Sequence, residues 1–186
     1  MLILASASPR RQELLRNAGI EFVVHPTDIA EIPEPGETPD ACAERLAREK
    51  ASAIAHLYPG RLILGADTIV VVDGEMLGKP ADAADAARML RLLSGQQHEV
   101  ITGVCLIGPG FQDVSSETTA VEFSELTEAE IAFYVSSREP MDKAGAYAIQ
   151  GIASRWIPRI KGDYSNVVGL PVALVYKLLR SRGALK

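Results

Sequence analysis

The chain of 186 residues contains few cysteines and histidines, and this scarcity limits the sites that it can build. The two cysteines, Cys42 and Cys105, stand far apart and lack the Cys-x-x-Cys spacing of redox and zinc sites. The three histidines, His25, His56 and His98, show no metal-ligand spacing. We therefore expect two buried free thiols, typical of a reducing compartment, and a structural hydrogen bond for His98.

Long apolar runs and an excess of positive charge are also missing. No apolar run approaches the ~20 residues that span a bilayer. The short apolar run at the N-terminus follows no basic region, so the sequence predicts no signal peptide. The net charge of −5 argues against a surface that binds nucleic acid polymers. We therefore expect a cytoplasmic protein with neither a membrane nor a nucleic acid partner.

The composition that remains, 47% hydrophobic and 23% charged residues, is that of an ordinary globular protein, and the length fits one domain over residues 1–186. Apolar periodicity and capping residues predict the elements along the chain. Helices are expected at 8–17, 38–57, 81–93, 127–136 and 170–179. Strands are expected at 2–5, 21–25, 61–72, 75–77, 98–107, within 114–123, and at 155–160.

The start of the first predicted helix carries Ser8, Pro9, Arg10 and Arg11. Ser8 suits the N-cap and Pro9 the first helical position. The positive end of the helix dipole disfavours each arginine by about 0.3 to 1 kcal/mol. Hydroxyls, unpaired backbone N–H groups and guanidinium groups at one helix N-terminus would suit an anion such as phosphate. A solvated or ion-paired arginine pair explains the same residues equally well, and the sequence contains no P-loop or G-x-G-x-x-G motif.

Asp67 and Thr68 interrupt LILGADTIVVV, the most apolar predicted strand. A carboxylate inside such a run is expensive to bury unless it is paired, hydrogen-bonded or bound to a metal. Structural capping of a nearby turn is the alternative. We favour a functional carboxylate, because acids in apolar surroundings cluster at functional sites.

Three further polar residues stand in predicted loops. Glu31 follows the second predicted strand, where a catalytic carboxylate or an ordinary solvated acid can stand. Lys79 precedes a proline and could contact a phosphate or carboxylate, or simply be solvated. Gln150 lies in the glycine-rich segment 141–151. Its amide could read the edge of a base or brace the loop, since it both donates and accepts hydrogen bonds.

The motifs together resemble the Maf family of nucleoside triphosphate pyrophosphatases over nearly the whole chain. They are SASPRR, RLAREKA, GADTIV, GKP, SGxxHxVxTGV at 94–104, MDKAGAYAIQG and GDYSNVVGLP, in that order. The resemblance implies an α/β fold with a mixed extended sheet flanked by helices, in two lobes around a cleft, similar to inosine triphosphate pyrophosphatase. It also favours a homodimer.

The activity that the resemblance implies is hydrolysis of a nucleoside triphosphate between the α and β phosphates, which yields the monophosphate and pyrophosphate with Mg²⁺ or Mn²⁺. Asp67 matches the general base, and Glu31 and Asp67 match metal-binding positions. Many members carry an acidic pair where this chain has Ala30 and Glu31, so one carboxylate of that pair is kept. The substrate-binding positions are Ser8, Arg10, Arg11, Lys50, Thr68, Lys79 and Gln150.

Substrate choice is associated with Thr68, Gln150 and the arginine pair. The form DKAGAYxIQG resembles the branch that acts on dTTP and UTP. One alternative is a pyrophosphatase for 7-methyl-GTP or other modified nucleotides. Another is a non-catalytic nucleotide-binding regulator of cell division, in which we would expect a damaged catalytic set.

Overall fold

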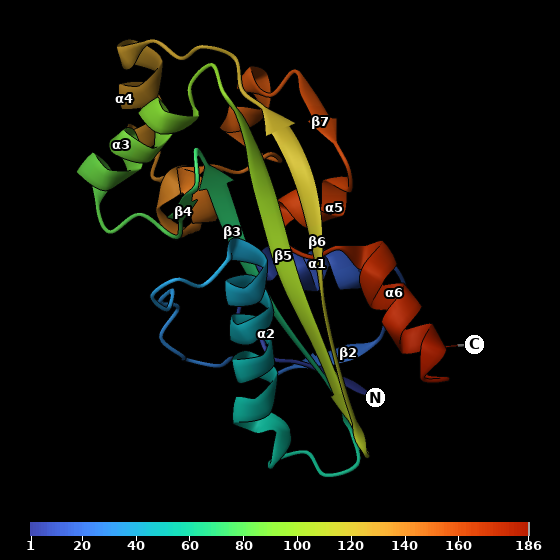
Figure 1. Cartoon of the computed structure of the whole chain (residues 1–186). Coiled ribbons are helices and arrows are strands. Elements are labelled where there is room, and N and C mark those ends of the chain that lie inside the picture. The colour runs from blue at the N-terminus through green and yellow to red at the C-terminus, as the bar shows by residue number, and fades with distance from the viewer. Residues whose placement is uncertain (186) are drawn as a thin grey trace. The chain divides into compact units, whose positions relative to one another are not determined.

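The computed structural model describes residues 1–185, which form a mixed sheet flanked by helices (Figure 1). The strands join in the order β2-β1-β3-β5-β6-β7, and β4 pairs with β3. β1 is parallel to both β2 and β3, whereas β4 and β7 pair antiparallel to β3 and β6. The expected α/β class with a mixed sheet is therefore confirmed.

The elements follow one another closely along the chain. The strands are β1 (Leu2–Leu4), β2 (Phe22–Val24), β3 (Leu62–Val72), β4 (Glu75–Leu77), β5 (Gln97–Gly108), β6 (Phe111–Glu122) and β7 (Arg159–Lys161). The α-helices are α1 (Pro9–Asn17), α2 (Pro39–Ala55), α3 (Ala83–Leu93), α4 (Glu128–Ser136), α5 (Tyr164–Val168) and α6 (Val172–Ser181). The 3-10 helices are η1 (Glu139–Asp142), η2 (Ala144–Ala146) and η3 (Ile152–Trp156).

The chain divides into two compact units. Unit 1 comprises residues 1–67, 102–117 and the chain from Gly169 onward, and unit 2 comprises residues 68–101 and 118–168. The strands β3, β5 and β6 each contribute residues to both units.

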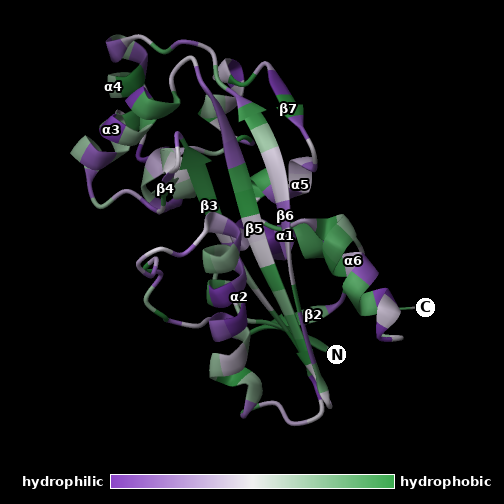
Figure 2. Ribbon diagram, in the orientation of Figure 1, coloured by the Kyte–Doolittle hydropathy of each residue, from purple (hydrophilic) through white to green (hydrophobic). Residues whose placement is uncertain are grey.

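In unit 1 the sheet is buried on both faces. Leu4 of β1 belongs to an apolar cluster with Leu15 of α1 and Val175 of α6. The neighbouring Ile3 belongs to a second cluster with Ala51 of α2. Successive side chains of a strand point to opposite faces, so β1 is apolar throughout rather than alternating. Figure 2 shows the same continuous hydrophobicity along much of β3.

Helix α2 packs directly on the backbone of β3 and β5. A Cβ atom at Gly65 would lie 2.1 Å from the carbonyl oxygen of Ala47, and one at Gly103 would lie 2.2 Å from that of Ala43. Only glycine permits this approach. It brings the helix turn that carries Lys50 against the strand that carries Asp67.

Unit 2 has its own apolar core beneath α3 and α4, in which α3 packs against α4 and η2. Tyr134 and Trp156 make an edge contact there. Phe123, His98 and Tyr147 form a second group of aromatic edge contacts. This core carries the loops that follow β4 and α4.

The sequence places most elements within a few residues of their observed limits, but the strand expected at 155–160 is wrong. Residues 152–156 form η3, and only the short β7 follows. Ala153 and Trp156 are buried at a spacing of three, which suits a 3-10 turn. Pro158 has no N–H group to donate to a sheet, which limits β7 to three residues.

Two further expectations concern the whole described chain. Cys42 and Cys105 are both buried and free, as expected. Among residues 1–185, none of the helices combines the length and the apolar character that crossing a membrane requires.

Candidate active site

The start of α1, in unit 1, has the expected local structure. Ser8 is the N-cap, its Oγ accepts a hydrogen bond from the Arg11 backbone N–H at 3.4 Å, and Pro9 opens the helix. The Ser8 N–H in turn donates to the Oγ of Ser6 at 3.2 Å. Arg10 is half-buried in the same helical turn. The turn therefore presents a serine, an arginine and the positive end of a helix together.

Arg11 is buried, with 9% of its surface exposed. Its Nε donates to the carbonyl oxygen of Gly169 at 2.8 Å, and one terminal nitrogen donates to Ser6 Oγ at 3.2 Å. Burial lowers the pKa of Arg11, and the nearby carboxylates of Asp67 and Glu31 oppose that shift. The guanidinium group is therefore fixed in orientation and lies within electrostatic reach of both carboxylates.

Ser6 also contacts this turn, although it is not among the predicted site residues. It is buried, and its hydroxyl group receives hydrogen bonds from both the Ser8 backbone and the Arg11 side chain. The available signal was a second serine just after an apolar strand. A hydroxyl at that position must find partners if it is buried.

Lys50 connects the two carboxylates that the sequence singles out. Its Nζ donates to Glu31 Oε1 at 2.6 Å and to Asp67 Oδ1 at 2.5 Å. The side chains of Lys50 and Asp67 are each 7% exposed, while that of Glu31 is 34% exposed. We call Glu31, Lys50 and Asp67 the acid–lysine cluster. The fold thus joins residues of a loop, α2 and β3 in one ionic group.

The cluster can be tested for its fit to a divalent metal ion. Two carboxylate oxygens lie within hydrogen-bond distance of one cationic nitrogen, so they converge on a position that suits positive charge. Within residues 1–185, no group of three or more His, Cys, Asp or Glu side chains is arranged to hold a metal. Mg²⁺ is commonly bound by one or two carboxylates together with substrate phosphates and water. Glu31 and Asp67 therefore fit a metal that shares its ligands with a substrate.

The remaining predicted site residues, Thr68, Lys79 and Gln150, belong to unit 2. Thr68 is half-buried on β3, directly after Asp67. Lys79 is exposed just beyond β4, and Gln150 is exposed in a turn closed by a hydrogen bond from the Gly151 N–H to the Ala148 carbonyl at 3.1 Å. Their roles in binding stay predictions.

His98, expected to make a structural hydrogen bond, does so. Its Nε2 lies 2.8 Å from the Tyr147 hydroxyl oxygen. Its Nδ1 is buried without a hydrogen-bond partner among the residues described. Burial lowers the pKa of His98 to about 4, so the imidazole is neutral at physiological pH.

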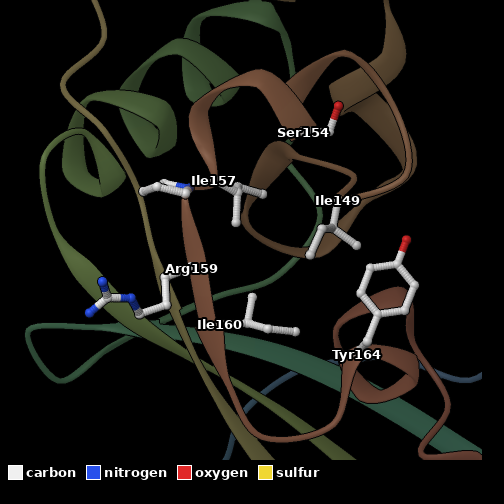
Figure 3. Close-up of a pocket in the computed structure, with 7 residues that line it drawn as sticks. Ile149, Ser154, Ile157, Arg159, Ile160 and Tyr164 are labelled. Carbon is white, nitrogen blue, oxygen red and sulfur yellow. The ribbon is translucent and has the colours of Figure 1, made fainter.

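Unit 2 also contains a pocket of about 370 Å³, shown in Figure 3. Its lining residues are Ile149, Ser154, Ile157, Pro158, Arg159, Ile160 and Tyr164. The lining includes one cation, no carboxylate and none of the predicted site residues. The pocket therefore lacks the groups that hydrolysis of an anhydride requires.

Comparisons with known proteins identify the family of the chain. A family model described as "Maf-like protein" matches residues 1–182. The dTTP/UTP pyrophosphatase of Koribacter versatilis is 58% identical over 184 residues, which cover 99% of this chain and 95% of that protein. The dTTP/UTP pyrophosphatase of Symbiobacterium thermophilum is 53% identical over 182 residues, which cover 98% of this chain and 94% of that protein.

Among solved structures, the Staphylococcus aureus Ham1 protein is similar with a TM-score of 0.53. It covers 97% of this chain and 98% of its own chain at 15% identity, so it supports the fold alone. The family match and the two relatives, in contrast, extend over nearly the full sequence. The chain therefore belongs to the Maf-like protein family.

Proposed function

We propose that this protein hydrolyses dTTP and UTP between the α and β phosphates, releasing the nucleoside monophosphate and pyrophosphate. The observation that carries the proposal is the buried carboxylate of Asp67, held by Lys50 within electrostatic reach of Arg11. The names of the relatives indicate the same substrates.

Asp67 acts as the general base in this proposal. Its carboxylate accepts a proton from the attacking water, whose oxygen bonds to the α phosphorus as the bond to the bridging oxygen breaks and pyrophosphate leaves. Lys50 holds Asp67 Oδ1 at 2.5 Å and so orients the carboxylate. The hydrogen-bonded carboxylate therefore keeps one orientation while it receives the proton.

The start of α1 supplies the phosphate-binding groups. Arg10, Arg11 and the backbone N–H groups of the first turn gather positive charge near the Ser8 hydroxyl. A triphosphate carries several negative charges, which these groups and Lys50 neutralise. Because Ser6 and Gly169 already fix the Arg11 guanidinium, little orientational freedom is lost when it binds the substrate.

We further propose that Glu31 and Asp67 hold a divalent cation, Mg²⁺ or Mn²⁺, together with the substrate. When bound, such an ion supplies charge neutralisation at the phosphate oxygens. Glu31 is the more exposed of the two carboxylates, so it can exchange its contact with Lys50 for another cation.

Substrate choice is assigned to Thr68 and Gln150, together with Arg10 and Arg11. Uracil and thymine share an edge that presents an acceptor and a donor, and the carboxamide of Gln150 presents the complementary donor and acceptor. Lys79 offers a cation for a phosphate oxygen.

Pyrophosphate release from a panel of nucleotides with Mg²⁺ tests the proposal. The panel contains dTTP, UTP, CTP, dGTP and 7-methyl-GTP, and kcat/KM is compared among them. We expect dTTP and UTP to be the best substrates. Release of orthophosphate instead, or no turnover of any triphosphate, would contradict the proposal. A preference for 7-methyl-GTP would support the alternative, a pyrophosphatase for 7-methyl-GTP or other modified nucleotides.

A further inference from the structure

Side chains of two residues outside the turn that carries Gln150 hold the backbone of that turn by hydrogen bonds. Gln150 itself is exposed, so its side chain gains no orientation from packing. A group that reads a ligand through hydrogen bonds must nevertheless be held in place, or binding loses free energy to ordering it. The orientation of Gln150 must therefore come from the backbone on either side of it.

Glu139 and Tyr134 hold that backbone on both sides of Gln150. The Ile152 N–H donates to the two carboxylate oxygens of Glu139, at 3.0 Å to Oε1 and 3.2 Å to Oε2. The Tyr134 hydroxyl donates to Glu139 Oε1 at 2.8 Å and accepts from the Ala148 N–H at 3.1 Å. One carboxylate–phenol pair thus fixes the residues two before and two after Gln150.

The pair fits its surroundings closely. A Cβ atom at Gly151 would lie 2.2 Å from Glu139 Oε1, so a side chain there would force the carboxylate or the turn to move. Tyr134 is fully buried, and burial raises the pKa of its hydroxyl, which therefore stays protonated and able to donate. The contact joins the fully buried Tyr134 hydroxyl to the half-buried Glu139 carboxylate, which fits closely against Gly151.

The same segment also reaches the backbone near the other predicted site residues of unit 2. The Gly145 N–H donates to the carbonyl oxygen of Gly78, the residue before Lys79, at 3.0 Å. Gly145 has φ +66°, and a Cβ atom there would lie 2.8 Å from Val70, which is two residues beyond Thr68 on β3. Residues 139–152 therefore connect to the backbone beside each of the three predicted site residues of unit 2.

We propose that Glu139, acting through Tyr134 and the backbone of residues 148–152, is a positioning residue that sets the orientation of Gln150 and so the choice of base. This inference rests on the proposed function, because it assumes that Gln150 contacts the substrate. Glu139 touches no reacting atom. Its loss affects how well the correct nucleotide binds and leaves the chemistry of Asp67 intact.

The test compares Glu139→Ala, Glu139→Gln and Tyr134→Phe with the wild type. KM and kcat are measured for dTTP and for CTP, whose base lacks the edge shared by uracil and thymine. In Glu139→Ala we expect KM for dTTP to rise about tenfold while kcat stays within about twofold, because an ordered hydrogen-bonding contact is lost. The preference for dTTP over CTP falls by the same factor.

Glu139→Gln is the rescue. The amide oxygen of glutamine can still accept from the Ile152 N–H and the Tyr134 hydroxyl, since both meet the same Oε1 atom. It should keep most of the preference for dTTP. Tyr134→Phe removes only the hydroxyl and should lose the preference as Glu139→Ala does, which keeps the test available if the alanine variant fails to fold.

The matched control is Glu130→Ala. Glu130 also lies on α4 with Tyr134, but its hydrogen bonds go to Thr127, where it completes the capping box, and to the Trp156 indole N–H. Its loss should destabilise α4 without changing the preference for dTTP. Equal loss of preference in Glu130→Ala, or an unchanged preference in Glu139→Ala, would overturn the inference. A wild type that turns over no triphosphate would instead overturn the proposed function.

Discussion

The two units carry their predicted site residues in opposite ways. In unit 1 three of the predicted side chains, Lys50, Asp67 and Arg11, are buried and charged, and each is held by hydrogen bonds to neighbouring groups. In unit 2 the predicted residues are exposed or half-buried, and the backbone on both sides of Gln150 is held by the buried Tyr134 and the half-buried Glu139. Unit 1 thus fixes the predicted side chains themselves, whereas unit 2 fixes the backbone that carries Gln150.

The difference has a physical reason. A group that accepts a proton or binds phosphate gains strength from low-dielectric surroundings, where each charge interacts more strongly. Burying such charges is costly, so each needs a partner of opposite sign or a polar neighbour. A group that reads a base edge needs to meet a ligand at the surface, so its orientation must come from the chain that carries it.

The largest effect should come from the charged side chain that performs the chemistry. Asp67→Asn keeps the size of the side chain and can still accept a hydrogen bond from Lys50, but it cannot accept a proton. We expect kcat to fall by about 10³-fold with an unchanged circular dichroism spectrum. Asp73→Asn, in the exposed turn after β3, is the control and should keep full activity. Activity in Asp67→Asn near that of the wild type would refute the general-base role.

The second prediction concerns how far the stability of the protein depends on the pairing of the buried charges in unit 1. Lys50→Met leaves the Asp67 and Glu31 carboxylates without their ammonium partner. We expect the free energy of unfolding in urea to fall by about 3 kcal/mol. Lys177→Met, on the exposed face of α6, should change it by less than about 0.5 kcal/mol. Equal stabilities of the two variants would show that solvent screens the acid–lysine cluster.

A third effect tests whether the interior of unit 2 depends on neutral polar groups. His98 has a pKa of about 4 when folded, below its usual value of 6.5, so the unfolded chain binds more protons between these pH values. Stability is therefore complete above about pH 6.5 and is lost as the pH falls toward about pH 4. His98 should contribute about 2 kcal/mol to the difference in unfolding free energy between pH 7 and pH 5.

The variant His98→Gln isolates this contribution, because its amide is neutral at both pH values and can still hydrogen-bond to the Tyr147 hydroxyl. Urea unfolding of both proteins at the two pH values gives the comparison. If the unfolding free energy of the variant depends on pH as strongly as that of the wild type, groups other than His98 cause the dependence. The stability of unit 2 would then not depend on a neutral His98.

The smallest effect concerns the geometry of a single cation. Arg11→Lys keeps the charge but loses the rigid fork that contacts Gly169 and Ser6 together. We expect kcat/KM for dTTP to fall about tenfold, chiefly through KM. Arg16→Lys, exposed in the last turn of the same helix, is the control. A fall of equal size in the two variants would mean that charge alone matters at this helix.

Most secondary structure could be predicted from the sequence because it depends on neighbours along the chain. Ser8 and Pro9 start α1, and the capping box of Thr127 and Glu130 starts α4, as expected. The failure at residues 155–160 has a tertiary cause. Trp156 turns inward to meet Tyr134 and Glu130, which no local pattern reveals.

The sequence by itself determined the residue types of the site, the starts of its helices and the family to which they belong. The contacts among these residues were decided only by the tertiary structure. The close packing of Gly65 against Ala47 accompanies the meeting of Lys50 and Asp67, and the fold joins Arg11 to Gly169 across most of the chain. Glu139 stands just beyond the predicted helix 127–136, yet its carboxylate accepts a hydrogen bond from the Ile152 N–H beside Gln150. Local periodicity reports which face of an element is buried, whereas hydrogen bonds between distant residues depend on how the elements pack.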